Sequence, residues 1–206
     1  AATAEKINGI YREFTPDVEV FSIDESFLDV TGCLRLFGGI QNIIDGIKSR
    51  LETELNLYAN LGVGPNKLIA KYASTSATKP NGQRIITQAD LPEILQDVPV
   101  DDLCGIGKRT RDKLALLSIN TCGDLAKFTI KELSRRFGVN GIKLHNMARG
   151  IDEAPVLREE DAAKVQSVGH SITYDKDIYT REEIENRLLH LAEMVARRAR
   201  KNLVTG

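Results

Sequence analysis

Three patterns in this chain of 206 residues predict an α+β fold. Residues 18–30 are largely apolar but are interrupted by the adjacent carboxylates of Asp24 and Glu25, which is typical of two strands joined by a turn. Amphipathic helices and further short strands follow up to about residue 97. From Val100 to Gly150 strand signals fade, and short helices punctuated by glycines dominate. An antiparallel hairpin with helices should therefore be followed by a small all-α region.

The first half of the chain alternates helices and strands. Thr15-Pro16-Asp17 ends the first helix, and apolar residues such as Ile40, Ile44 and Ile47 recur on one face of the longest one. We expect helices at residues 4–14, 38–56, 66–74 and 89–95, strands on both sides of Asp24-Glu25, and short strands at 57–63 and 84–87.

The second half is expected to be helical up to residue 150. Residues 151–163 contain Pro155 and an acidic run and are interpreted as a linker. A strand and a long amphipathic helix then follow, but one strand and one helix cannot close a core alone. The expected elements are helices at 109–117, 121–127, 130–137 and 140–149, a strand at 165–174 and a helix at 182–203.

Neither a membrane span nor a secretory signal is evident in the sequence. The three cysteines, Cys33, Cys104 and Cys122, are widely spaced and form no metal-finger pattern. Their odd number favours reduced thiols in a cytoplasmic protein.

The net charge of −1 conceals a segregation of charge along the chain. Residues 1–64 carry a net −5, whereas residues 108–150 hold ten basic and three acidic residues and carry +7. A basic block of this kind is the electrostatic footprint of a protein that binds a polyanion. Solvated helix faces would explain scattered lysines and arginines but not their segregation.

The Asp24-Glu25 pair is the strongest candidate for chemistry. Neighbouring residues on a straight strand point to opposite faces, so the two carboxylates share one site only if the chain turns there. A carboxylate pair on a rigid hairpin suits hard cations such as Mg²⁺. The alternative is a purely structural turn, because aspartate is common in turns.

Four motifs occur in an order that resembles the Y-family (translesion) DNA polymerases, closest to their DNA polymerase IV-like branch. They are Ser22 to Asp29, Gly62 to Lys71 followed by Ala77 to Gly82, Leu103 to Lys108, and Gln166 to Ser171. The resemblance covers nearly the whole chain. It implies a partial palm with the metal-binding hairpin at 1–97, a helix–hairpin–helix thumb at 98–157, and the truncated start of an α/β little finger at 164–206.

The same resemblance implies a template-directed DNA polymerase, which performs nucleotidyl transfer in translesion synthesis and DNA repair. Asp24 would bridge two Mg²⁺ ions, and Glu25 would bind the catalytic one. In the family a further aspartate lies on a first palm strand, and no counterpart occurs here before residue 17; the fingers are missing as well. We therefore expect weak metal binding and no polymerase activity from this chain alone.

Three lysines add to this picture. By the resemblance Lys79, within Ala-Thr-Lys-Pro-Asn-Gly, contacts the triphosphate of an incoming deoxynucleoside triphosphate. Lys67 and Lys71 are four residues apart on one helix face, and they lie either near the phosphates or simply in solvent.

The segment Gly105-Ile106-Gly107, followed by Lys108 and Arg109, predicts a helix–hairpin–helix that binds DNA. Glycines let the backbone approach a phosphate, and N–H groups at the following helix start point outward, while Ile106 should plug the hairpin into the core. Such a contact positions duplex DNA without reading its sequence. A G-x-G segment alone is more often only a turn, but its position beside the +7 block favours DNA binding here. Residues 137–143 are a candidate for a second, degenerate copy.

The implied partners are primer–template DNA, deoxynucleoside triphosphates and a sliding clamp, the last through a segment beyond residue 206. The main alternative is a non-catalytic helix–hairpin–helix module that binds duplex DNA. Lys79 argues against that alternative, because a pure binding module needs no triphosphate lysine. A palm-type nucleotide cyclase is the third hypothesis, and the +7 block argues against it.

Overall fold

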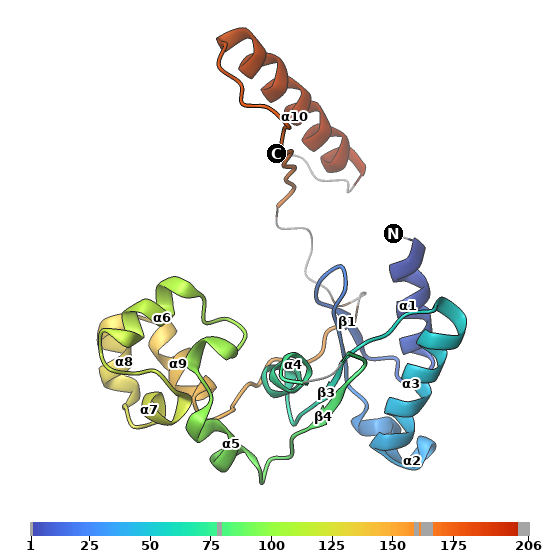
Figure 1. The fold of residues 1–206 in the computed structure, drawn as a ribbon, viewed down its shortest axis with the longest axis vertical. Coiled ribbons are helices and arrows are strands. Elements are labelled where there is room, and N and C mark those ends of the chain that lie inside the picture. Colours follow the sequence, from blue (N-terminus) through green and yellow to red (C-terminus); the bar gives the residue numbers. More distant parts are fainter. Residues whose placement is uncertain (1, 78–79, 159–160, 162–166, 202–206) are drawn as a thin grey trace. The chain divides into compact units, whose positions relative to one another are not determined.

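The computed structural model of the protein describes residues 2–77, 80–158, 161 and 167–201. The chain forms two compact units, Ala1–Glu160 and Asp161–Gly206. The larger unit combines helices with two separate two-stranded sheets, as Figure 1 shows. The predicted α+β class is confirmed.

The hairpin around the carboxylate pair forms as predicted. β1 (Val18–Val20) pairs antiparallel with β2 (Ser26–Leu28), and the loop 21–25 joins them. The first two N–H groups of the loop both donate to the carbonyl oxygen of its last residue, Glu25, at 2.9 and 3.1 Å. The two carboxylates therefore lie in a closed hairpin loop and not on a straight strand.

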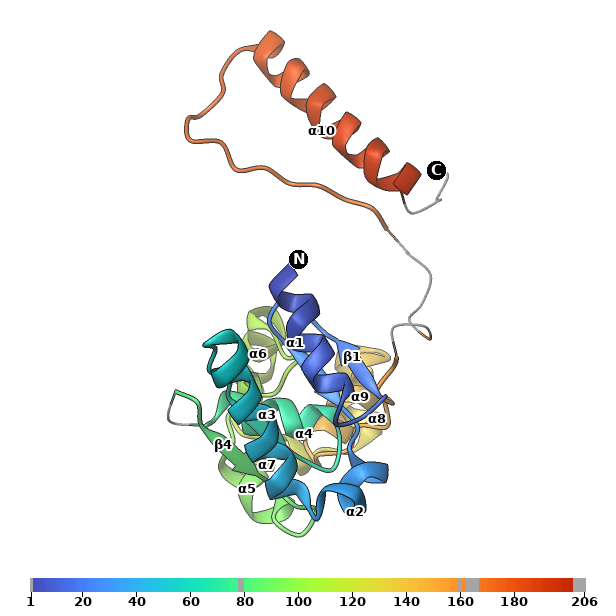
Figure 2. The same cartoon turned by 90° about the vertical axis from the view of Figure 1, so that its right-hand side faces the viewer.

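Two helices pack beside the hairpin and form a first apolar core. α1 (Ala2–Arg12) packs against the long α3 (Ile40–Leu55), and the two are seen side by side in Figure 2. A 3₁₀ turn, η1 (Thr31–Cys33), and the short α2 (Leu34–Phe37) lead from β2 into α3. The face of α3 that was predicted to be apolar is the buried one. The core consists of Ile10, Phe14, Ile43, Ile47 and Leu51.

The second sheet pairs β3 (Leu61–Val63) with β4 (Gln83–Ile85) in parallel. α4 (Lys67–Thr75) connects the two strands and packs very closely on β3. Gly62 permits this approach, because a Cβ atom there would lie 2.1 Å from the carbonyl oxygen of Ala70. The contact between backbones holds α4 in place beside the hairpin.

A second, larger core joins α4 to the helices that follow. It runs from Leu68 to Ala148 and so crosses the boundary expected between residues 97 and 98. The division into 1–97 and 98–157 stays a prediction. Thr121 and Thr129 each begin a helix with a capping box. The helical elements are α5 (Leu91–Asp97), the 3₁₀ turn η2 (Val100–Asp102), α6 (Lys108–Ala115), α7 (Cys122–Ala126), α8 (Ile130–Phe137) and α9 (Asn140–Met147).

The smaller unit contains the long helix α10 (Arg181–Lys201), close to the expected range. The expected strand at 165–174 is wrong for residues 167–174, the part of it that the structure describes. A strand needs a neighbour for its backbone hydrogen bonds, and no described segment of this unit supplies one. Of the helices that the structure describes, none is long and apolar enough to span a membrane.

Asn66 holds α4 at its start and also ties it to a distant segment. Its Oδ1 accepts from the Ile69 N–H at 3.0 Å, and its Nδ2 donates to the Gly150 carbonyl oxygen at 2.7 Å. Asn66→Ala should therefore lower the free energy of unfolding by about 2 kcal/mol, measured by urea denaturation. Asn66→Asp keeps the cap but places a carboxylate oxygen against the Gly150 carbonyl oxygen, so it should also lower the stability. Equal stability of Asn66→Ala and the wild type would contradict this reading.

Candidate metal centre and nucleic-acid interface

The carboxylate pair lies at the end of the hairpin loop. The Ser22 hydroxyl donates to Asp24 Oδ1 at 2.7 Å, which orients that carboxylate within the loop. Asp24 is exposed, whereas Glu25 is half-buried. The loop thus presents one free and one partly enclosed carboxylate, as expected of a candidate metal site rather than of a core turn.

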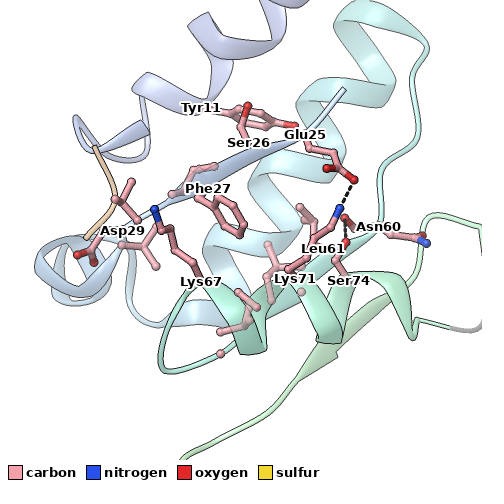
Figure 3. Close-up of a pocket in the computed structure, with 18 of the residues that line it drawn as sticks. Tyr11, Glu25, Ser26, Phe27, Asp29, Asn60, Leu61, Lys67, Lys71 and Ser74 are labelled. Carbon is pink, nitrogen blue, oxygen red and sulfur yellow. Dashed lines mark hydrogen bonds and ion pairs between the residues drawn. The ribbon is translucent and has the colours of Figure 1, made fainter. Parts of the chain in front are cut away.

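Two lysines of α4 reach the hairpin. Lys71 forms an ion pair with Glu25 (Figure 3), and Lys67 Nζ lies 2.8 and 3.0 Å from the two carboxylate oxygens of Glu19 on β1. The lysine side chains are only 17% and 18% exposed. The interpretation of these lysines as solvated is therefore wrong, because both are paired with carboxylates. A role near phosphates stays a prediction.

The residues after the helical part return to the hairpin. The Leu157 N–H donates to Glu19 at 2.8 Å, and Arg158 Nε lies 2.5 Å from Asp17 Oδ1. Asp152 accepts from the Leu68 N–H at 3.2 Å, at the start of α4. The segment 152–158, which was interpreted as part of a linker, is thus a polar strap along the hairpin and α4. These contacts were missed because their partners are more than 80 residues apart in the sequence.

A cavity of about 770 Å³ lies between the hairpin, α3, β3 and α4. β2 pairs only with β1 and β3 only with β4 among the described strands, yet both strands line this cavity (Figure 3). Apolar residues of α3, including Ile40, also line it. Burial raises the pKa of the Tyr11 phenol at its edge. The cavity therefore has strand edges on two sides and an apolar helix beside them.

The carboxylates fit only part of a divalent metal site. Divalent cations such as Mg²⁺ prefer several oxygen ligands in a regular arrangement. Asp24 and Glu25 offer carboxylate oxygens, but Glu25 is engaged by Lys71. No group of three or more histidine, cysteine or acidic side chains that could hold a metal occurs among the described residues. A complete site needs at least one further ligand.

Lys79 lies outside the described residues, so its predicted role is not tested. Its neighbours Pro80 and Asn81 line the cavity that also contains Asp24 and Glu25. Lys48 Nζ donates to the Asn81 carbonyl oxygen at 2.8 Å and ties this turn to α3. Pro80 and Asn81 therefore border the same cavity as the carboxylate pair.

The predicted helix–hairpin–helix begins at Gly105, whose φ of 104° favours glycine. Ile106 is 4% exposed within the larger core, so its predicted role as a plug is confirmed. Gly107 precedes α6, and the N–H groups of Lys108 and Arg109 have no partner among the described residues. The side chains of Lys108 and Arg109 are exposed and form no salt bridge in that part of the chain. This hairpin can present N–H groups and positive charge to a phosphate.

The basic block contains both structural and free cations. Arg111 pairs with Asp101 and Asp112, and Arg149 donates to the carbonyl oxygens of Ala126 and His145. Other cations of the block are exposed and form no salt bridge with a described residue. They are Lys108, Arg109, Lys113, Lys131, Arg135, Arg136 and Lys143.

The candidate second copy at 137–143 forms a tight turn between α8 and α9. Gly138 has a φ of 61°, and Val139 at the turn is 85% exposed. A Cβ atom at Gly141 would lie 2.4 Å from the Ser134 nitrogen, so glycine lets the two helices cross closely. Two helices joined by a tight turn agree with a second, degenerate copy of the motif, and its role in DNA binding stays a prediction.

Known protein families match the chain in three consecutive segments. The impB/mucB/samB family matches residues 1–75, the thumb domain of DNA polymerase-iota matches residues 101–152, and the C-terminal domain of the impB/mucB/samB family matches residues 165–206. Together with the carboxylate hairpin and the helix–hairpin–helix, these matches place the chain in a class of DNA polymerases. The chain belongs to the Y-family DNA polymerases.

Curated relatives and a solved structure agree with this class. DNA polymerase IV of Moorella thermoacetica is 46% identical over 195 residues, which are 95% of this chain and 48% of the relative. DNA polymerase IV of Desulfatibacillum aliphaticivorans is 40% identical over 203 residues, 98% of this chain and 50% of the relative. A Y-family DNA polymerase chimera of Dbh and Dpo4 matches with a TM-score of 0.67 and 28% identity, over 75% of this chain and 45% of that one. The chain spans about half the length of the curated relatives it matches.

Proposed function

We propose that this chain is part of a DNA polymerase IV-like enzyme that performs template-directed nucleotidyl transfer in translesion synthesis and DNA repair. One observation carries the proposal: the hairpin loop holds Asp24 and Glu25 beside the same cavity that the Pro80-Asn81 turn borders. This arrangement supports a site where metal-binding carboxylates act together with the predicted triphosphate lysine, Lys79, which lies outside the described residues. The matched DNA polymerase IV relatives support the same reaction class.

In this proposal the metal ions are Mg²⁺, held in part by Asp24 and Glu25. The ions would lower the pKa of the attacking 3′-hydroxyl and carry the charge of the triphosphate. The remaining ligand would come from a further strand outside the described residues. The cavity between the unpaired edges of β2 and β3 supports this idea, because an inserted strand would find hydrogen-bond partners on both sides.

DNA binding is assigned to the helix–hairpin–helix. Gly105, Ile106 and Gly107 shape the hairpin, while Lys108 and Arg109 supply charge next to free N–H groups. Contacts of this type hold the duplex through its phosphates and ignore base sequence. Lys143 adds charge beside the same hairpin, because its Nζ lies 3.8 Å from the position of a Cβ atom at Gly105. The proposed substrates are primer–template DNA and deoxynucleoside triphosphates, and we place the reaction in the cytoplasm.

For the chain as given, duplex binding without catalysis is the second candidate function. The incomplete group of carboxylates among the described residues favours it. A sliding clamp remains a proposed partner of the longer protein, through a segment beyond residue 206. The two candidates differ in one respect: only the first requires metal-dependent primer extension.

Lys108→Ala combined with Arg109→Ala should weaken DNA binding equally for all duplex sequences. The slope of log affinity against log salt should become shallower by about 2, because each of the two cations neutralises one phosphate. Fluorescence anisotropy with labelled duplexes at several salt concentrations measures this slope. Lys127→Ala is the control, because Lys127 is already paired with Asp124 at 3.0 Å and should leave the slope unchanged. A slope equal to that of the wild type in the double variant would show that this hairpin does not bind DNA.

A further inference from the structure

Two ion pairs link α4 to the hairpin, one helical turn apart. Lys67 pairs with Glu19 on β1, and Lys71 pairs with Glu25 in the loop. The two lysines occupy the positions i and i+4, so they leave the same face of α4. Only the second pair involves a carboxylate that we assign to metal binding.

The Lys71 ammonium is held at this place by its surroundings. The opposite face of α4 is in the core, where Ile69 and Ala73 are fully buried. The backbone of α4 is also in close contact with β3 at Gly62, so the helix packs on both the core and the sheet. Lys71 Nζ also lies 6.0 Å from the centroid of the Phe21 ring. The positive charge is therefore positioned before any ligand arrives.

We propose that the Lys71 ammonium is a built-in counter-ion of the Glu25 carboxylate, and that a divalent cation reaches Glu25 only by displacing it. This inference rests on the proposed metal role of the hairpin. A divalent cation and an ammonium compete for the same carboxylate oxygens. Lys71 thereby neutralises the Glu25 carboxylate when no metal is bound and lowers the affinity of the site for metal.

The structure also offers the displaced ammonium a place to go. Lys71 lines the cavity of about 770 Å³ together with Asn60 and Ser74, whose hydroxyl and carbonyl groups are polar (Figure 3). Its side chain has four rotatable carbon–carbon bonds, so the ammonium can leave Glu25 while α4 stays in place. Glu25 is 39% exposed, so an incoming cation has access to the carboxylate.

The pair of Lys67 and Glu19 differs in a way that makes it a matched control. Both Glu19 oxygens contact Lys67, and one also accepts from the Leu157 N–H at 2.8 Å. The Glu19 side chain is 19% exposed, about half the exposure of Glu25. Lys67 thus stabilises the strap and the hairpin and does not guard a metal ligand.

The test is a titration of the chain with MgCl₂, followed by the amide NMR shifts of the hairpin loop. Lys71→Gln should tighten Mg²⁺ binding by about fivefold, because the cation then no longer has to break a partly exposed ion pair. Lys67→Gln should leave the dissociation constant within about twofold of the wild type, and so should Lys71→Arg, which keeps the charge. Glu25→Gln should weaken binding in the wild-type background and remove the gain produced by Lys71→Gln.

The outcomes separate this inference from the proposed function. If Glu25→Gln weakens Mg²⁺ binding but Lys71→Gln does not tighten it, the counter-ion role is wrong and the metal assignment stands. If no variant shows Mg²⁺-dependent shifts at the loop, the metal assignment is wrong and this inference is wrong with it. Equal tightening in Lys67→Gln and Lys71→Gln would indicate a general charge effect and would also overturn the inference.

Discussion

Replacing Asp24 or Glu25 by Ala in the full-length polymerase is expected to abolish primer extension while DNA affinity is retained. Loss of a metal ligand removes charge stabilisation worth several kcal/mol, so the rate should fall by roughly a thousandfold or more. DNA affinity should not fall, because we assign duplex binding to the helix–hairpin–helix, outside the hairpin loop. Extension assays with Mg²⁺ and anisotropy with the same primed template measure the two properties.

The control for this experiment is a carboxylate on a neighbouring helix. Asp45 on α3 accepts a hydrogen bond from Gln41 at 2.9 Å and lies on the exposed side of that helix. Asp45→Asn should leave extension unchanged, because it removes a similar charge without touching the loop. Extension that survives in Asp24→Ala and Glu25→Ala would refute the metal assignment.

Gly62→Ala is expected to disrupt the fold of the larger unit. The new Cβ atom would lie 2.1 Å from the Ala70 carbonyl oxygen and 2.2 Å from the Ser74 nitrogen. Both atoms belong to the backbone of α4, so no side-chain rotation relieves the clash, and α4 must move away from β3. We expect a loss of about 3 kcal/mol or more in the free energy of unfolding. Urea denaturation followed by circular dichroism measures it.

The matched control is Gly9→Ala in α1. A Cβ atom there meets nothing within 4 Å, so the substitution adds helix propensity without a clash. It should stabilise the protein by about 0.5–1 kcal/mol. A Gly62→Ala variant as stable as Gly9→Ala would show that the close contact between β3 and α4 does not exist in solution.

Local patterns allowed the hairpin and the helix–hairpin–helix to be predicted. The apolar run that Asp24-Glu25 interrupts indicates a turn within a few residues, and the hairpin forms there. Likewise, the glycines on either side of Ile106 and the buried isoleucine itself are read from a short segment. In both cases the information lies within a few residues of the feature it predicts.

Contacts between distant segments could not be predicted in the same way. The spacing of Lys67 and Lys71 placed them on one helix face, but not against Glu19 and Glu25, because that depends on how α4 packs against β3. The residues around Asp17 and Glu19 did not indicate that the strap at 152–158 would bind these two carboxylates. Charge complementarity offered one hint of these ion pairs: the hairpin is acidic, and one face of the helix carries two lysines.

The strand expected at 165–174 does not form in its described part, residues 167–174, for a related reason. Its composition favours an extended chain, but a strand forms only where a neighbour supplies hydrogen bonds. Residues 167–174 contact α10 instead, through the bond between Arg198 and Gly169. A sequence pattern indicates the propensity of a segment for extended structure, but it does not indicate whether a partner strand is present.

The most direct test of the account is a primer-extension assay on this chain and on its Asp24→Ala variant. Each would receive Mg²⁺, deoxynucleoside triphosphates and a primed template, with duplex binding measured in parallel. We predict that neither extends the primer and that both bind the duplex, because the described residues offer two carboxylates and no third ligand to complete the metal site. Extension by the chain that is lost in Asp24→Ala would contradict this account, since it would show a complete polymerase site within these residues.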